Sequence, residues 1–402
     1  MTKQTKIRTA LLIAILVLIL AALFMYGSTQ QEKPATISSA PQDDIKEAAS
    51  VPPTKTLEDW AQQYKDIKLV DAHNHSASNR AYDWKLDMMW DKYGVDRIVL
   101  FGNVSEPSAV GTDKITWKAY QQYPERFIPF ASGIHLLEPS GLKAAKDYLE
   151  QGFFGLGELA IASTYSEALA HSIWKTEHPM DGILPELYAL CAEYKAPILM
   201  HIDPPQGIPM LKLEEAAKKY SDTIFIFGHA NAYNSPESIR SLLSEHPNVY
   251  ADFFAGFTAF NPSSAYKLED FVPIIKEFPD RFLLSTDSGY GLTSEENAIQ
   301  AMYMLLNALD DPVLAKKIAS GNIERLISEH RLHILSLPQF GNWKIRQAKN
   351  TTLRICPKKM PASYCSKQVN RYQALQMSRQ LISLLCHPLL AVTGKGASII
   401  LR

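Results

Sequence analysis

Eight short apolar runs, separated by amphipathic segments, constrain the fold of this chain more than any other feature of its sequence. The runs begin near residues 67, 97, 127, 153, 197, 223, 248 and 281. Their continuous apolar character is typical of strands that are covered on both faces, as in a parallel sheet. The segments between them carry apolar residues at helical spacing. The alternation therefore predicts eight consecutive β–α units.

The size of this repeating region favours one arrangement of the units. Eight units over roughly 265 residues fit a closed β/α barrel, for which about 250 residues are typical. An open, doubly wound sheet is the structural alternative, but no glycine-rich phosphate-binding fingerprint follows the first run. We therefore predict an α/β fold in which a (β/α)8 TIM barrel occupies residues 57–330.

The N-terminus predicts a membrane anchor. Three basic residues within the first eight precede an apolar run over residues 10–26, which is at the short end of the roughly 17–25 residues that span a bilayer. We expect a transmembrane signal anchor over 1–26 with its start in the cytoplasm, and a cleaved signal peptide is the alternative. A flexible linker, rich in Ser, Gln, Pro and Ala, follows over 27–56. Either alternative places the barrel on the periplasmic or extracellular side.

Charge is distributed unevenly along the chain. The formal net charge of -1 points to no nucleic-acid partner. All 42 acidic residues lie before residue 331, whereas residues 331–402 contain twelve Lys and Arg and no acid. This basic tail is therefore a different kind of sequence from the barrel, either a basic appendage or the product of a shifted reading frame.

Side chains that bind metals follow several of the predicted strands. The carboxyl ends of barrel strands converge on one mouth, where active sites lie. The first run ends in an H-x-H pair, whose two side chains share a face of an extended chain and can hold one ion together. One such histidine alone is weak evidence, but their repeated occurrence at strand ends is strong. The candidate metal ligands are His73, His75, Glu158, His201, His229 and Asp287.

The donor types indicate which ion such a site would prefer. His201 adds a third imidazole nitrogen to the H-x-H pair, and Asp287 adds a carboxylate. This mixture suits Zn²⁺, with Mn²⁺, Fe²⁺ or Co²⁺ as alternatives. We expect one or two divalent ions.

The motifs around these residues resemble the amidohydrolase superfamily, and more closely its amidohydrolase-related (amidohydrolase 2) branch. The similar stretches are V-D-A-H-N-H, I-L-M-H, F-G-H-A, L-S-T-D and A-S-G-N-I-E-R-L-I, which together span about residues 67–328. The resemblance implies that His73, His75, His201 and Asp287 bind metal.

Two positions stay open within that resemblance. His229 is implied to be either the acid/base residue or a ligand of a second metal. Many relatives have a carboxylated Lys on the fourth strand that bridges two metals, whereas this chain has Glu158 there. Glu158 is expected either to bind or bridge the ions, or to orient a histidine from behind.

The resemblance also implies an activity. A metal-activated water would hydrolyse an amide, lactone, ester or phosphoester bond of a small-molecule substrate. Asp287 would accept a proton from the water, and Asp287 or His229 would protonate the leaving group. A metal-dependent nonoxidative decarboxylase of the same branch is the alternative, and a non-catalytic envelope binding protein is a third. Relatives often form dimers, so a homodimer is a further expectation.

Overall fold

The computed structural model of this protein describes residues 55–166, 169, 171–337, 344–347 and 353–356. The predicted signal anchor, the linker as far as residue 54 and most of the basic tail lie outside these residues. Within the described part of the chain, no helix is both long enough and apolar enough to cross a membrane.

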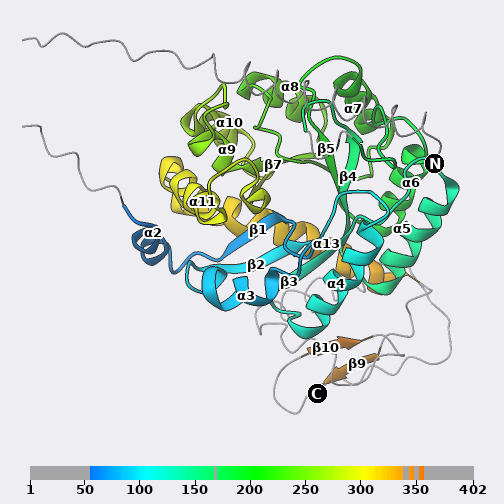
Figure 1. Ribbon diagram of the computed structural model, residues 1–402, viewed down its shortest axis with the longest axis horizontal. Helices are drawn as coiled ribbons and strands as arrows, with labels where there is room; N and C mark the ends of the chain where they lie inside the picture. Colours follow the sequence, from blue (N-terminus) through cyan, green and yellow to red (C-terminus); the bar gives the residue numbers. More distant parts are fainter. Residues whose placement is uncertain (1–54, 167–168, 170, 338–343, 348–352, 357–402) are drawn as a thin grey trace, which may run out of the picture. The chain divides into compact units, whose positions relative to one another are not determined.

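Eight parallel strands form the centre of the fold, and neighbours in sequence are neighbours in the sheet (Figure 1). Each begins within two residues of the position expected from the sequence, so the predicted β/α barrel is confirmed. All but β2 are buried along their whole length, which explains why they read as uninterrupted apolar runs. The strands are β1 (Leu69–Asn74), β2 (Val95–Leu100), β3 (Phe127–Ala131), β4 (Gly155–Ala162), β5 (Ile198–Ile202), β6 (Phe225–Phe227), β7 (Val249–Phe254) and β8 (Phe282–Ser285).

Side-chain hydrogen bonds join the last strand to the first. The Thr286 amide, just after β8, donates to Asp71 Oδ1 at 2.9 Å, and the Thr286 hydroxyl donates to Asp71 Oδ2 at 2.5 Å. Asn74 Nδ2 donates to Thr286 Oγ1 at 3.3 Å. These contacts close the barrel at the end where the candidate ligands lie.

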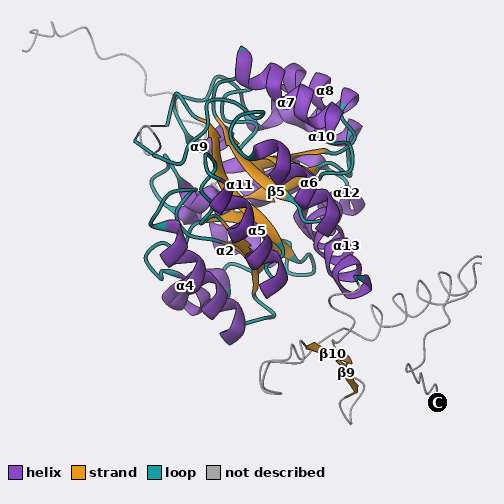
Figure 2. Cartoon of the chain, turned by 90° about the vertical axis from the view of Figure 1, so that its right-hand side faces the viewer, coloured by secondary structure: helices purple, strands orange, loops and turns teal. Residues whose placement is uncertain are grey.

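Helices surround the strands (Figure 2). Many of them begin with proline in the first turn, where its missing N–H costs nothing, and several have a Ser, Thr or Asp side chain as N-cap. The helices are α2 (Leu57–Gln63), α3 (Tyr82–Lys85), η1 (Leu86–Trp90), α4 (Ala109–Gln122), α5 (Pro139–Gln151), α6 (Leu184–Tyr194), α7 (Ile208–Lys219), α8 (Pro236–Glu245), α9 (Ala255–Phe260), η3 (Leu268–Phe271), α10 (Val272–Glu277), η4 (Asp287–Gly289), α11 (Glu295–Leu309), α12 (Pro312–Lys316), η5 (Lys317–Gly321) and α13 (Asn322–Ser336).

The apolar core has two layers. One lies between the strands and the helices, and the other lies inside the barrel, where side chains from β1, β2, β3, β5, β6, β7 and β8 meet three residues of α13. Leu199 on β5 and Tyr250 on β7 belong to the inner layer. His201 and Asp252 follow two positions later on the same strands, so their side chains also face the interior. The strand period thus directs polar groups into the barrel at its carboxyl end.

The last helix runs past the expected barrel boundary at residue 330. Helix α13 continues to Ser336, because Ile334 is still buried against the core. In the described part of the tail, β9 (Lys344–Gln347) and β10 (Leu353–Cys356) pair antiparallel.

Candidate metal centre

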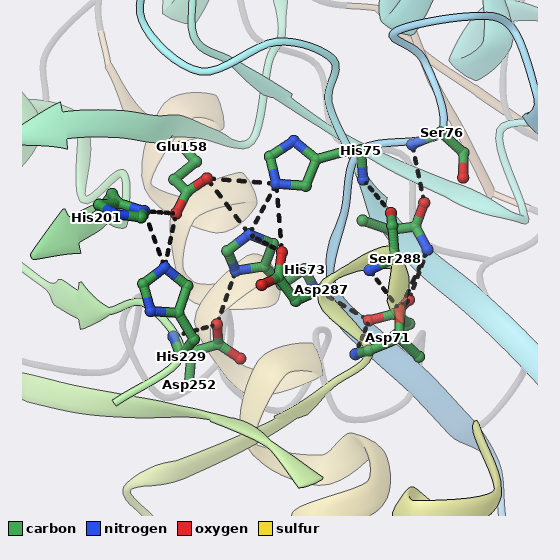
Figure 3. Close-up of polar contacts among 12 residues, drawn as sticks. Asp71, His73, His75, Ser76, Glu158, His201, His229, Asp252, Asp287 and Ser288 are labelled. Carbon is green, nitrogen blue, oxygen red and sulfur yellow. Dashed lines mark hydrogen bonds and ion pairs between the residues drawn. The ribbon is translucent and has the colours of Figure 1, made fainter. Parts of the chain in front are cut away.

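The six residues singled out as candidate ligands come together at the carboxyl end of the barrel (Figure 3). His73 and Glu158 lie on β1 and β4, and His201 lies on β5. The other three follow directly after strands, in the loops of the mouth. Their donor atoms form two groups, each within 4.8 Å, which are His73, His75 and Asp287 in the first and Glu158, His201 and His229 in the second.

The first group places two imidazoles and a carboxylate around one point. The Nε2 atoms of His73 and His75 are 3.2 Å apart. Asp287 Oδ1 lies 3.3 Å from the former and 3.4 Å from the latter. The H-x-H pair therefore shares a face, as the strand period predicts.

The second group has the same composition. Glu158 Oε1 lies 3.0 Å from His201 Nδ1 and 3.1 Å from His229 Nε2, and these two nitrogens are 3.0 Å apart. His229 therefore faces the cluster as a donor, next to His201.

Glu158 links the two groups, as Figure 3 shows. Its Oε1 faces the second group, while its Oε2 lies 3.3 Å from His75 Nε2 and 3.6 Å from His73 Nε2. The side chain is 2% exposed. A carboxylate with one oxygen toward each group has the geometry of a bridge.

Hydrogen bonds to the outer ring nitrogens orient the histidines. Asp252 Oδ2 lies 2.7 Å from His73 Nδ1 and also accepts the His229 amide at 2.9 Å. Asp203 Oδ2 lies 3.3 Å from His201 Nε2. The Gly102 carbonyl oxygen lies 2.7 Å from His75 Nδ1. Each contact leaves the other nitrogen of the ring facing the cluster, which is how outer partners usually hold metal-binding histidines.

Asp203 and Asp252 are not among the six candidate ligands expected from the sequence. A sequence signal nevertheless exists for both. Asp203 follows His201 by two positions, and Asp252 lies within the buried run V-Y-A-D-F-F on β7. A carboxylate inside an apolar barrel requires a partner, and a neighbouring histidine supplies one.

Three residues in the loops at the mouth have sparsely populated backbone conformations. His229, Asp287 and Ser288 have φ values of 35°, 44° and 51°. Such conformations persist only where the surrounding structure enforces them, and they are frequent at functional sites. Here the Ser288 hydroxyl accepts the His75 amide at 2.8 Å, which ties the β8 loop to the H-x-H pair.

The electrostatics of the cluster favour positive charge. Burial lowers the pKa of His73, but the negative charges of Glu158 and Asp287 outweigh it and hold this pKa well above its usual range. Burial likewise lowers the pKa values of His75 and His201, yet neighbouring carboxylates raise both to about 9. Conversely, the histidines hold the pKa values of the Glu158 and Asp287 carboxyls below their usual range, against burial. The site therefore stabilises cations.

The residues present fit divalent ions. Four imidazole nitrogens and two carboxylates converge in a buried space, and no Lys or Arg of the described chain forms an ion pair with them. In the absence of a cationic side chain, only protons or metal ions can offset the two carboxylates. Imidazole with carboxylate is a donor set for Zn²⁺ and for other first-row divalent ions.

A cavity of about 420 Å³ opens onto this cluster. Asn103 and Tyr290 line it, whereas His135, His171 and His178 do not. The long connection between β4 and α6 contributes two described residues, Ser166 and Leu169. The walls are formed by His75, Ser78, Asn103, Val104, Glu106, Glu158, Ser166, Leu169, His201, His229, Ala232, Tyr233, Phe254, Phe257, Asp287, Ser288 and Tyr290.

A closed barrel of eight parallel strands with a histidine and carboxylate cluster at its carboxyl end defines a class, the β/α barrels with a candidate metal centre at the mouth. The family model described as amidohydrolase matches residues 58–328, and the chain belongs to this family. The resemblance recognised in the motifs is therefore confirmed. No curated protein matches the sequence.

Solved structures with the same fold include an uncharacterised TIM-barrel protein from Bordetella bronchiseptica, which is 17% identical with a TM-score of 0.50, over 66% of this chain and 100% of that one. A 2,6-dihydroxybenzoate decarboxylase from Rhizobium is 13% identical with a TM-score of 0.47, over 65% and 99% of the two chains. A dihydroxybenzoic acid decarboxylase from Polaromonas sp. JS666 is 15% identical with a TM-score of 0.43, over 67% and 100%. Likeness at these identities extends to the fold alone.

Proposed function

We propose that this protein is a hydrolase that uses two divalent metal ions, with Zn²⁺ as the preferred ion, to cleave an amide, lactone, ester or phosphoester bond of a small molecule. The observation that carries the proposal is the position of Glu158, whose two carboxylate oxygens face two separate groups of donors. A site for one ion would need only one of these groups.

The distances between donor atoms divide the ligands between the two ions. His73, His75 and Asp287 would hold one ion, His201 and His229 the other, and Glu158 would contact both. The Nε2 atom of His229 lies within 3.1 Å of Glu158 and His201. This position supports a ligand role for His229 over its alternative role as the acid that protonates the leaving group.

Asp287 is the residue best placed to carry a proton. When bound, the ions supply Lewis acidity, which lowers the pKa of a water to about 7 and polarises the substrate oxygen. Asp287 lies on the cavity wall and accepts a proton from the attacking water, whose oxygen bonds to the carbonyl carbon or phosphorus. The bond to the leaving nitrogen or oxygen then breaks, and Asp287 passes its proton to that atom.

Export of the barrel remains a proposal, supported by the basic and then apolar N-terminus over residues 1–26. Fractionation of expressing cells, followed by protease treatment of intact spheroplasts, tests it. A barrel in the membrane fraction that is digested from outside supports an anchor, and release in the soluble exported fraction supports a cleaved signal. The homodimer expectation is tested by light scattering on the same preparation.

Metal content tests the centre itself. Elemental analysis of the purified full chain after incubation with Zn²⁺ should find about two equivalents. His201→Ala and His73→Ala should each lose about one, and His171→Ala should lose none, because His171 is exposed and lies off the cavity wall. A folded protein that takes up no Zn²⁺, Mn²⁺, Fe²⁺ or Co²⁺ would rule out the proposal.

The reaction type needs a separate assay. Loaded protein should release acid and leaving group from esters, lactones or amides, and Asp287→Asn should abolish release while keeping the ion held by His201 and His229. The decarboxylase alternative predicts loss of CO₂ from aromatic carboxylic acids instead.

A further inference from the structure

Beyond the candidate ligands, one side of the cavity is apolar and aromatic. Phe254, Phe257 and Ala232 pack in a small cluster of their own at the start of α9, separate from the main core. Tyr233 stacks edge-on against Phe257, with ring centroids 5.7 Å apart. We call Ala232, Tyr233, Phe254 and Phe257 the aromatic wall.

The aromatic wall is built on a rigid support. Asn231, which precedes it, donates from Nδ2 to the Phe254 carbonyl oxygen at 2.8 Å and accepts the Phe254 amide at the same distance. This reciprocal pair joins the β6 and β7 loops. Phe254 is 1% exposed and Phe257 is 7% exposed, so the wall is formed before any ligand arrives. A preformed apolar surface beside polar reacting groups is typical of a small-molecule pocket.

Apart from the candidate ligands, the charge on the cavity wall is negative. Among the lining residues that the structure describes, none is Lys or Arg. Apart from the candidate ligands, the charged member is Glu106, which accepts hydrogen bonds from Asn103 Nδ2 at 3.0 Å and from the Ser108 hydroxyl. A carboxylate or phosphate group held away from the ions would therefore lose its water without gaining a cationic partner, and it would meet a like charge.

We infer that the substrate presents an uncharged aromatic or bulky apolar group to the aromatic wall, next to the bond that is cleaved, and that Phe257 and Glu106 set this preference. The inference rests on the proposed function and narrows it, because it favours neutral acyl compounds over substrates with a second anionic group. Phe257 selects for the ring by contact, and Glu106 selects against a second negative charge in the pocket.

Hydroxamates separate binding from turnover, because the hydroxamate group chelates the ions and the remainder of the molecule probes the pocket. We would titrate zinc-loaded full-length protein with acetohydroxamate, benzohydroxamate and 4-carboxybenzohydroxamate by calorimetry. Benzohydroxamate should bind about 10- to 100-fold more tightly than acetohydroxamate, as burial of a ring predicts. The carboxylated compound should bind at least about tenfold more weakly than benzohydroxamate.

Substitutions test whether Phe257 and Glu106 set the preference for an uncharged ring. Phe257→Ala should bring the affinity for benzohydroxamate close to that for acetohydroxamate, with unchanged zinc content. Phe260→Ala, on the same helix but off the cavity wall, should keep the wild-type ratio. Glu106→Gln should strengthen binding of the carboxylated compound, whereas the exposed Glu138→Gln should not.

The outcomes are distinct. Equal affinity for the three compounds, tighter binding of the carboxylated one, or an unchanged ratio in Phe257→Ala overturns the inference. A protein that takes up no metal overturns the proposed function instead. In that case, saturation-transfer NMR of the metal-free protein with phenol and benzoate still decides the inference, since the aromatic wall includes no metal ligand and should select phenol.

Discussion

Two aspartates behind the histidines determine how the cluster is oriented. Of these two aspartates, Asp203 contacts only His201 among the candidate ligands, whereas Asp252 contacts both groups of donors, through the His73 ring and the His229 amide. Its Oδ1 atom is buried without a partner in the described structure, so its negative charge is directed entirely at these two donors. Removal of that charge should weaken the binding of both candidate ions.

We expect Asp252→Asn to weaken zinc affinity about 10- to 100-fold, because the amide keeps the shape but loses the charge that orients His73 and raises its basicity. Competition with a chromophoric chelator measures the affinity. Asp222→Asn, on the connection between α7 and β6, is the control and should behave as wild type. Unchanged affinity in Asp252→Asn would show that the histidines are oriented without it.

The metal-free protein should lose stability as pH rises from about 6.5 to above 9. The pKa values of His75 and His201 are raised to about 9 in the folded chain, against about 6.5 when unfolded. The folded state then binds more protons than the unfolded state between these values, so the stabilisation is complete below pH 6.5 and is lost through pH 9.

Thermal unfolding of chelator-treated protein between pH 6 and pH 10 measures this dependence. The double variant His75→Gln and His201→Gln should show a much flatter profile over the same range. A wild-type melting temperature that rises with pH would contradict the expectation.

At the scale of elements, the approach of β4 to β5 decides where Glu158 lies. Gly157, which precedes it, has a φ of 135°, a conformation open to glycine but strained for other residues. A Cβ atom there would lie 2.6 Å from the Leu199 carbonyl oxygen on β5. The backbone of β4 can therefore pass close to β5 only because this position has no side chain.

Gly157→Ala should lower the free energy of unfolding by about 1–3 kcal/mol and reduce metal content, because relief of the clash displaces Glu158. Gly111→Ala is the matched control. It lies on α4 with open space where the Cβ would go, and it should stabilise by about 0.5–1 kcal/mol. Denaturant unfolding and elemental analysis check both variants. If Gly157→Ala is destabilised but keeps its full metal content, the packing of β4 against β5 does not determine the position of Glu158.

At the scale of the whole molecule, the candidate ligands come from five of the eight β–α units. They lie on or after β1, β4, β5, β6 and β8. Ions held by all six residues would therefore connect distant parts of the barrel. Metal binding should contribute to the stability of the barrel as a unit.

We expect a chelator to lower the melting temperature in a single cooperative transition. With free Zn²⁺ at about a thousand times its dissociation constant, the linked stabilisation is about 4 kcal/mol. Differential scanning calorimetry with and without chelator measures it, and His73→Ala should show a smaller difference. An identical melting temperature in both conditions would argue against structural coupling of the ions.

Local patterns in the sequence were sufficient for the barrel and for the identity of the candidate ligands. Strand period and apolar runs depend on neighbouring residues, so eight strands and the donors at their ends could be predicted within two residues. The same patterns placed His73 and His75 on one face. Helix α13 runs six residues past the expected domain boundary at residue 330, since its last turns are held by contacts with the core rather than by local signals.

Only the tertiary structure shows which of these side chains come together. Glu158 contacts His201 and His229, which lie 43 and 71 positions away from it in the chain. The link from Asp252 to His73 spans 179 positions. The aromatic wall likewise arises from two loops that meet at the mouth. Contacts between residues so far apart in the chain depend on how the barrel closes. Sequence patterns report only which face of an element a side chain occupies.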